Sequence, residues 1–211
     1  MIKHEDIVTF DIYQTELSLI LYQALMKEMT VGNGGAHYSF KSTEHKSKHE
    51  RQVTGYMGEC AMFLHYYGTQ GMTLFNEYRM HYNRDPHKPD DGHDFKGVDI
   101  KTRRLIRTGS NANFHRFPIN NNILNFECIV RPVNAYSPDH RYLMIIVEYE
   151  DSLLQGVLNK ATINLVGWGY LRDAIYYPDG QTGIKKAHYA LQTNKMYPIK
   201  QLIEEFKSNE R

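Results

Sequence analysis

The five residues Val98-Asp99-Ile100-Lys101-Thr102 begin the stretch that decides the fold. Apolar and polar side chains alternate from Val98 to Ile106, which is the pattern of a half-buried β-strand. Because successive side chains of a strand point to opposite faces, Ile100 is expected on one face and Asp99 and Lys101 on the other. One face of this strand therefore belongs to the core, and the other carries an acid and a base side by side.

Two further carboxylates are expected close to this strand. Gly97 predicts a turn directly before it, so that a tight hairpin would bring Asp94 near Asp99. Glu59 lies in the first turns of a predicted helix, Thr54–Tyr67, where a carboxylate can either serve a site or simply favour the positive end of the helix dipole. Mg²⁺ prefers carboxylate, carbonyl and water oxygens, and a nearby lysine can bind a phosphate or orient the attacking water. The candidate catalytic residues are therefore Glu59, Asp94, Asp99 and Lys101.

An acid two positions before a lysine is not informative by itself, because the pattern occurs four times: Glu44 with Lys46, Asp94 with Lys96, Asp99 with Lys101, and Glu205 with Lys207. The third instance differs in its context. It has an apolar middle residue in a strand, a turn and a carboxylate before it, and basic residues after it. A second register, in which Asp90 and Asp94 act with Lys96, stays open.

The rest of the chain alternates between predicted helices and strands. Helices are expected at Asp11–Met29, Thr54–Tyr67, from Leu171 onward and at Ile199–Phe206. Strands are expected at Val98–Ile106, Phe126–Val133, Tyr142–Glu148 and Ile163–Trp168. A stretch rich in Pro, Asp, His and Asn, His81–Gly92, predicts a surface loop. This alternation indicates an α/β fold.

Length and composition narrow the classes of protein that fit. A chain of 211 residues with 41% hydrophobic residues can bury one sizeable core. No apolar run is long enough for a membrane span, no signal peptide is recognisable, and two cysteines suit a reducing compartment, so a cytoplasmic protein without a membrane partner is expected. Lys plus Arg (25) nearly balances Asp plus Glu (24), so any basic surface must be local.

The order of these motifs resembles the PD-(D/E)XK nuclease superfamily from about Thr54 to Tyr197. The matching pieces are Gly58-Glu59 in a helix, Gly92-His93-Asp94-Phe95, Val98-Asp99-Ile100-Lys101-Thr102, and Val166-Gly167-Trp168-Gly169-Tyr170-Leu171. A weaker similarity to small phage and prokaryotic members covers Tyr189-Ala190-Leu191 and Met196-Tyr197-Pro198. The hairpin between Asp94 and Asp99 is shorter than in many members, and the pair Pro89-Asp90 lies upstream of the expected place.

The resemblance implies a restriction-endonuclease-like fold, with a central mixed β-sheet flanked by helices and an added N-terminal helix. It divides one nuclease domain, 1–211, into an N-terminal helix and basic loop (1–53), a core (54–198) and a C-terminal helix (199–211). It also implies that Glu59, Asp94, Asp99 and the backbone carbonyl of Ile100 bind Mg²⁺, for which Mn²⁺ can substitute, and that Lys101 promotes hydrolysis. Basic residues near these positions would contact the nucleic acid: Lys48, Arg51, Arg103, Arg104, Arg107 and His115.

The leading hypothesis is therefore a Mg²⁺-dependent nuclease that hydrolyses DNA phosphodiester bonds by attack of an activated water. A nucleic-acid-binding or assembly protein that keeps the fold without the chemistry is the alternative from another class. A hydrolase of small phosphoesters is a third reading of the same residues. Enzymes that cut both strands often act as homodimers, and the sequence leaves this arrangement open.

Overall fold

A computed structural model describes the fold in residues 2–31, 48–84, 94–105, 123–149, 160–178 and 187–210. Its α-helices are α1 (Gln14–Val31), α2 (Lys48–Tyr67), α3 (Gly71–Arg84) and α4 (Ile199–Asn209). Its strands are β1 (Val8–Tyr13), β2 (Val98–Leu105), β3 (Glu127–Val130), β4 (Arg141–Glu148), β5 (Lys160–Tyr170), β6 (Ile175–Tyr177) and β7 (His188–Gln192).

The larger of the two sheets is mixed. Its strand order is β1-β5-β4-β2, in which β2 runs parallel to β4 and the other neighbours are antiparallel. A smaller antiparallel sheet has the order β3-β7-β6. The expected α/β class with a mixed sheet and flanking helices is thus confirmed. Among the described strands β2 pairs with β4 alone, so β2 forms one edge of the larger sheet.

Strand β4 sorts its side chains into two cores. Leu143 and Ile145 pack in one apolar cluster, whereas Met144 and Ile146 pack in the other, because alternate side chains point to opposite faces of the sheet. All four are fully buried. A continuous apolar run is typical of a strand covered on both faces, and β4 follows this rule.

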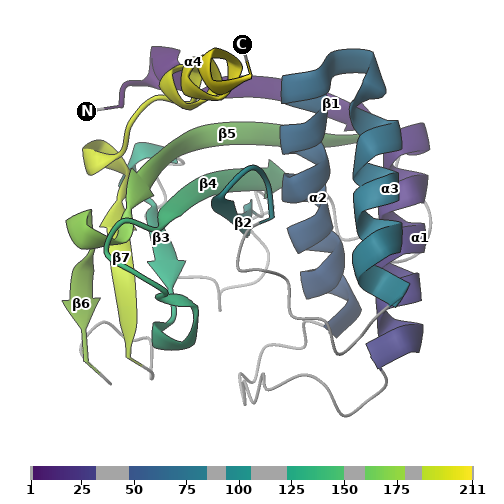
Figure 1. The fold of residues 1–211 in the computed structure, drawn as a ribbon, viewed down its shortest axis with the longest axis horizontal. Coiled ribbons are helices and arrows are strands. Elements are labelled where there is room, and N and C mark those ends of the chain that lie inside the picture. The colour runs from purple at the N-terminus through teal and green to yellow at the C-terminus, as the bar shows by residue number, and fades with distance from the viewer. Residues whose placement is uncertain are drawn as a thin grey trace, which may run out of the picture.

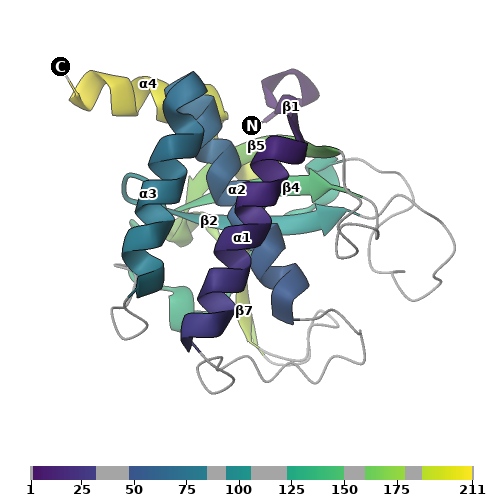
Figure 2. The same ribbon diagram turned by 90° about the vertical axis from the view of Figure 1, so that its right-hand side faces the viewer.

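Three helices cover one face of the larger sheet, and the small sheet covers the other. Figure 2 shows α1, α2 and α3 side by side in front of β2, β4 and β5, and Figure 1 shows β3, β6 and β7 at the opposite end of the molecule. The C-terminal helix α4 lies across the top in Figure 1, with Ile199, Leu202 and Phe206 buried, as its spacing predicted. The result is a layer of helices, a central sheet and a smaller sheet.

Several elements differ from the sequence predictions, and His81–Arg84, the start of the stretch predicted as a loop, is the last turn of α3. The first helix begins at Gln14 rather than at Asp11, because Val8–Tyr13 pairs with β5 as an edge strand. No helix begins at Leu171, where a single 3₁₀ turn leads into β6 and pairing with β7 takes over. Helix α3 was not predicted at all. Local patterns do not report pairing with distant strands, which decides the first two cases.

Candidate active site at the edge of strand β2

A two-residue hairpin turn precedes β2 and places Asp94 beside it. Phe95 and Val98 exchange backbone hydrogen bonds, with N···O distances of 3.1 and 2.9 Å. The two residues between them have positive φ angles, 42° at Lys96 and 77° at Gly97, as a type I′ turn requires. Such a turn matches the twist of the strands it joins. The hairpin expected at Gly97 is therefore confirmed, and it reverses the chain so that Asp94 returns alongside β2.

Asp94 binds the edge of β2 that faces away from β4. Its Oδ2 accepts a hydrogen bond of 2.8 Å from the backbone N–H of Ile100. The N–H and C=O of one strand residue point toward the same side of the strand, so the carbonyl of Ile100 faces this edge as well. A carboxylate and a backbone carbonyl thus lie along the edge that β4 does not cover, and both belong to the larger set, with Glu59 and Asp99, that the resemblance implied for a metal ion.

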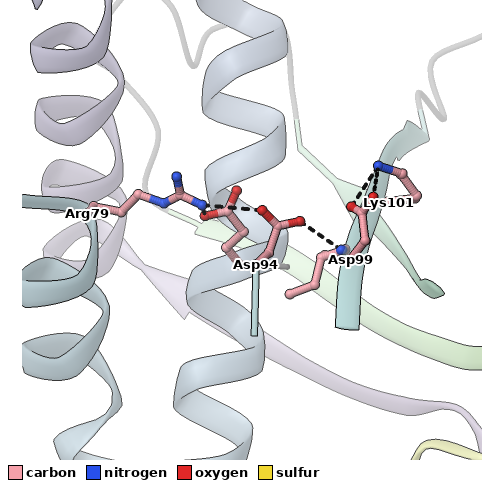
Figure 3. Close-up of polar contacts among 6 residues, drawn as sticks. Arg79, Asp94, Asp99 and Lys101 are labelled. Carbon is pink, nitrogen blue, oxygen red and sulfur yellow. Dashed lines mark hydrogen bonds and ion pairs between the residues drawn. The ribbon is translucent and has the colours of Figure 1, made fainter. Parts of the chain in front are cut away.

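The side chains of Asp99 and Lys101 lie on the same face of β2, as the alternation of the sequence predicts. The ammonium of Lys101 lies 2.6 Å from each carboxylate oxygen of Asp99 (Figure 3). Burial raises the pKa of Asp99 to about 7, Lys101 opposes this increase, and the neighbouring Asp94 carboxylate adds to it. Burial alone would lower the pKa of Lys101, but the Asp99 carboxylate outweighs it and raises that pKa. Asp94 and Asp99 are therefore close enough to repel each other.

Glu59 reaches the same edge from helix α2. Gly58 lets this helix approach β2 closely, because a Cβ at position 58 would collide with Oγ1 of Thr102. The expectation that Glu59 lies near a helix N-terminus is wrong, since α2 begins at Lys48 and Glu59 lies about three turns into it. Favouring the helix dipole is therefore not its role. Its side chain is 10% exposed and forms an ion pair with Arg79.

Arg79 is the member of the site that the sequence predictions missed. It comes from helix α3, its side chain is 6% exposed, and its Nη2 pairs with Glu59 and lies 3.6 Å from Oδ1 of Asp94. Figure 3 shows Arg79 pointing at Asp94 from the side opposite to Lys101. Its guanidinium also lies 4.4 and 5.0 Å from the ring centres of Tyr56 and Tyr78. In the sequence, only the position of Arg79 at helical spacing from apolar residues could have indicated that it lies at the buried face of a helix.

The donor set fits a divalent ion that keeps part of its water shell. Within the described part of the chain, no three His, Cys, Asp or Glu side chains converge as a group that could hold a metal ion. Mg²⁺ does not require such a cage, because it is commonly bound by one or two carboxylates and several waters. Asp94, Asp99 and the Ile100 carbonyl offer this number of ligands, and the two mutually repelling carboxylates would be stabilised by a cation between them.

Two of the arginines predicted to bind nucleic acid are engaged within the protein. Arg104 is 4% exposed, pairs at 2.5 Å with Glu50 and donates to the carbonyl of Tyr149. Arg103 donates to the carbonyl of Glu127 at 2.9 Å. This geometry favours a structural role for Arg104 in joining β2 to the first turn of α2.

Of the other basic positions predicted to contact nucleic acid, the structure describes the side chain of one. Arg51 is exposed on α2. The side chain of Lys48, and the whole of Arg107 and His115, lie outside the described residues. In the second register, Asp90 also lies outside them, and the ammonium of Lys96 pairs with Glu210 and sits 4.6 Å from the ring centre of Tyr66. The Lys96 ammonium is thus held by Glu210 and Tyr66, whereas that of Lys101 contacts Asp99, which favours the register of Asp99 with Lys101.

Comparison with protein-family models, with curated proteins and with solved structures found no match. The described helices include none with the length and apolar character that crossing a membrane requires. A function for this chain is therefore inferred from the residues of the site and their contacts.

Proposed function

We propose that this chain is a Mg²⁺-dependent deoxyribonuclease with a restriction-endonuclease-like fold. The observation that carries the proposal is the meeting of Asp94, Asp99, Lys101 and the Ile100 carbonyl at the edge of β2 that pairs with no other described strand. A lysine held against one of two adjacent carboxylates is expected at a metal-dependent phosphodiesterase site, because that reaction needs both an anionic metal site and a cation for phosphate or water. An ordinary surface ion pair would not need the second carboxylate.

Each residue has a distinct task in this proposal. Asp94, Asp99 and the Ile100 carbonyl would hold Mg²⁺, which supplies charge neutralisation at the phosphate and acidifies water. Lys101, which pairs with Asp99 in this structure, would hold the scissile phosphate or orient the attacking water once a bound metal neutralised that carboxylate. Glu59 would not bind the metal directly, because its carboxylate forms an ion pair with Arg79.

A gel assay tests this function. Supercoiled plasmid, linear duplex, single-stranded DNA and RNA are incubated with the protein in Mg²⁺, Mn²⁺ or EDTA. We expect cleavage of DNA with either ion and none in EDTA, and we expect Asp99→Ala to be inactive. Cleavage in EDTA, or equal cleavage by Asp99→Ala, would contradict the proposal.

A non-catalytic nucleic-acid-binding protein remains the second candidate, and one observation favours it. Arg79 forms an ion pair with Glu59 and approaches Asp94. It therefore neutralises part of the negative charge of the site without a metal. This candidate predicts DNA binding with no turnover under any metal condition. A nitrophenyl phosphodiester added to the same assay separates the third reading, because a small-phosphoester hydrolase would cleave it and leave all nucleic acids intact.

A further inference from the structure

Arg79 occupies a place where a second cation would otherwise be expected. Its Nη2 lies between the carboxylates of Glu59 and Asp94, and both arginine and glutamate are almost entirely buried. A buried carboxylate without a partner is costly, so a cation beside Glu59 stabilises its ionised form. In this structure the guanidinium of Arg79, on α3, provides the positive charge beside Glu59.

The charges of the site leave room for one divalent ion. When all are ionised, three carboxylates (Glu59, Asp94 and Asp99) face two cations (Arg79 and Lys101), which leaves one negative charge in excess. One divalent ion changes this excess to a single positive charge, which matches the single negative charge of a phosphodiester. A second divalent ion would leave three positive charges in a largely buried cluster, which is unfavourable.

The surroundings of Arg79 hold it in this position. Its guanidinium lies against the rings of Tyr56, on the same helix as Glu59, and Tyr78. Aromatic faces attract a desolvated guanidinium. Leaving the site would therefore expose two carboxylates and two rings at once.

We infer that Arg79 takes the place of a second metal ion and makes this a one-metal site, in which Glu59 binds the arginine rather than the metal. The inference rests on the proposed function, because it concerns the metal that Asp94 and Asp99 would hold. It makes Arg79 a positioning residue whose charge sets the number of ions bound.

Metal titration tests the inference without using cleavage. Mn²⁺ binding to the full chain is measured by calorimetry and by electron paramagnetic resonance for four proteins: wild type, Arg79→Met, Arg79→Lys and the surface control Arg172→Met. We expect two Mn²⁺ ions per chain for Arg79→Met and one for each of the others. Two ions in the wild type, or one in Arg79→Met, overturns the inference.

Glu59→Gln supplies a second measurement that does not depend on the folding of Arg79→Met. In an otherwise wild-type chain it should weaken Mn²⁺ binding, because it removes one negative charge from the cluster, but it should leave the stoichiometry at one ion per chain, because Glu59 binds Arg79 and not the ion. Loss of all Mn²⁺ binding, as expected for a missing metal ligand, overturns the inference. In the Arg79→Met background, the same substitution should remove the second ion.

The failure of the inference and the failure of the proposed function give different results. A wild-type chain that binds no Mn²⁺ removes the proposed function together with the inference. A wild-type chain that binds Mn²⁺ and cleaves DNA, combined with either overturning result above, removes the inference alone.

Discussion

At the scale of single residues, Asp99 and Lys101 depend on each other. Asp99 is 6% exposed, and the ammonium of Lys101 is its direct counter-ion. The neighbouring Asp94 carboxylate makes ionisation of Asp99 harder, and Lys101 makes it easier. A cation brought to the carboxylates would replace the lysine and leave its ammonium for the substrate. Under the proposed function, metal binding would thus free Lys101 from this ion pair.

Replacing Lys101 with Met should reduce DNA cleavage by about 10²- to 10⁴-fold, the range expected for loss of a proton-transfer or phosphate-orienting group. The fold should survive, because Asp99 can take up a proton when its counter-ion is lost. Cleavage rates and circular dichroism measure the two effects. Lys207→Met is the matched control, since Lys207 has the same acid-x-Lys spacing but is exposed on α4. Equal activity of the two variants would contradict the role of Lys101.

The raised pKa of Asp99 makes the metal-free protein less stable as pH rises. The folded state holds the Asp99 proton up to about pH 7, whereas the ordinary pKa is 3.8, so folding is favoured at low pH and this contribution disappears as pH increases through about 7. The loss should amount to roughly 2–4 kcal/mol. Urea denaturation in EDTA across this range measures it.

The control for that experiment is a comparison of two asparagine variants. Asp99→Asn should flatten the pH dependence, because the titrating group is gone. Asp139→Asn should leave it as in the wild type, because the Asp139 side chain is 75% exposed. A wild-type profile as flat as that of Asp99→Asn would contradict the raised pKa of Asp99.

At the scale of elements, the site depends on how closely α2 approaches β2. Gly58 faces Thr102 at this contact, and the next residue of the helix, Glu59, is thereby carried to the strand edge. Gly55 lies on the same helix with open space around its Cα. Gly58 thus allows the short distance between α2 and β2, and this distance places the Glu59 carboxylate at the strand edge.

Replacing Gly58 with Ala should destabilise the protein by about 1–3 kcal/mol, as overpacking a well-filled contact does. Gly55→Ala should instead stabilise it by up to about 1 kcal/mol, because alanine favours a helix where space permits. Thermal and urea denaturation measure both. Thr102→Ala should partly restore the stability of Gly58→Ala, since the hydroxyl is the nearest atom. Equal stability of the two alanine variants would contradict the close approach.

At the scale of the whole molecule, the layers bring three segments to one edge: α2, α3, and the hairpin that continues into β2. Helices α2 and α3 deliver Glu59 and Arg79, the hairpin delivers Asp94, and β2 delivers Asp99 and Lys101 (Figure 3). The C-terminal helix α4 also packs near the hairpin, where Phe206 contacts Phe95. Under the proposed function, a ligand bound at this edge would therefore contact residues from several elements of the fold.

Mg²⁺ should stabilise the folded protein against unfolding, because the unfolded chain does not bring its ligands together. At a free concentration about 100-fold above the dissociation constant, the free energy of unfolding should increase by about 2.7 kcal/mol. Melting temperatures with Mg²⁺ and with EDTA measure the difference. Asp94→Asn and Asp99→Asn should abolish it, whereas Asp139→Asn should keep it. The same increase in all variants would place the ion elsewhere.

The sequence by itself determined the local features of this protein. Alternation along β2 put Asp99 and Lys101 on one face, Gly97 predicted the turn that returns Asp94, and apolar spacing predicted α4. These features depend on backbone geometry over a few residues, which composition and periodicity report directly.

Only the tertiary structure decided what the local patterns cannot contain. Pairing with β5 turned Val8–Tyr13 into a strand, and packing of α3 brought Arg79 between Glu59 and Asp94. The burial of Arg104 against Glu50 likewise depends on α2 meeting β2. Each of these contacts joins residues far apart in the chain, so its energy depends on an arrangement that no short stretch of sequence specifies.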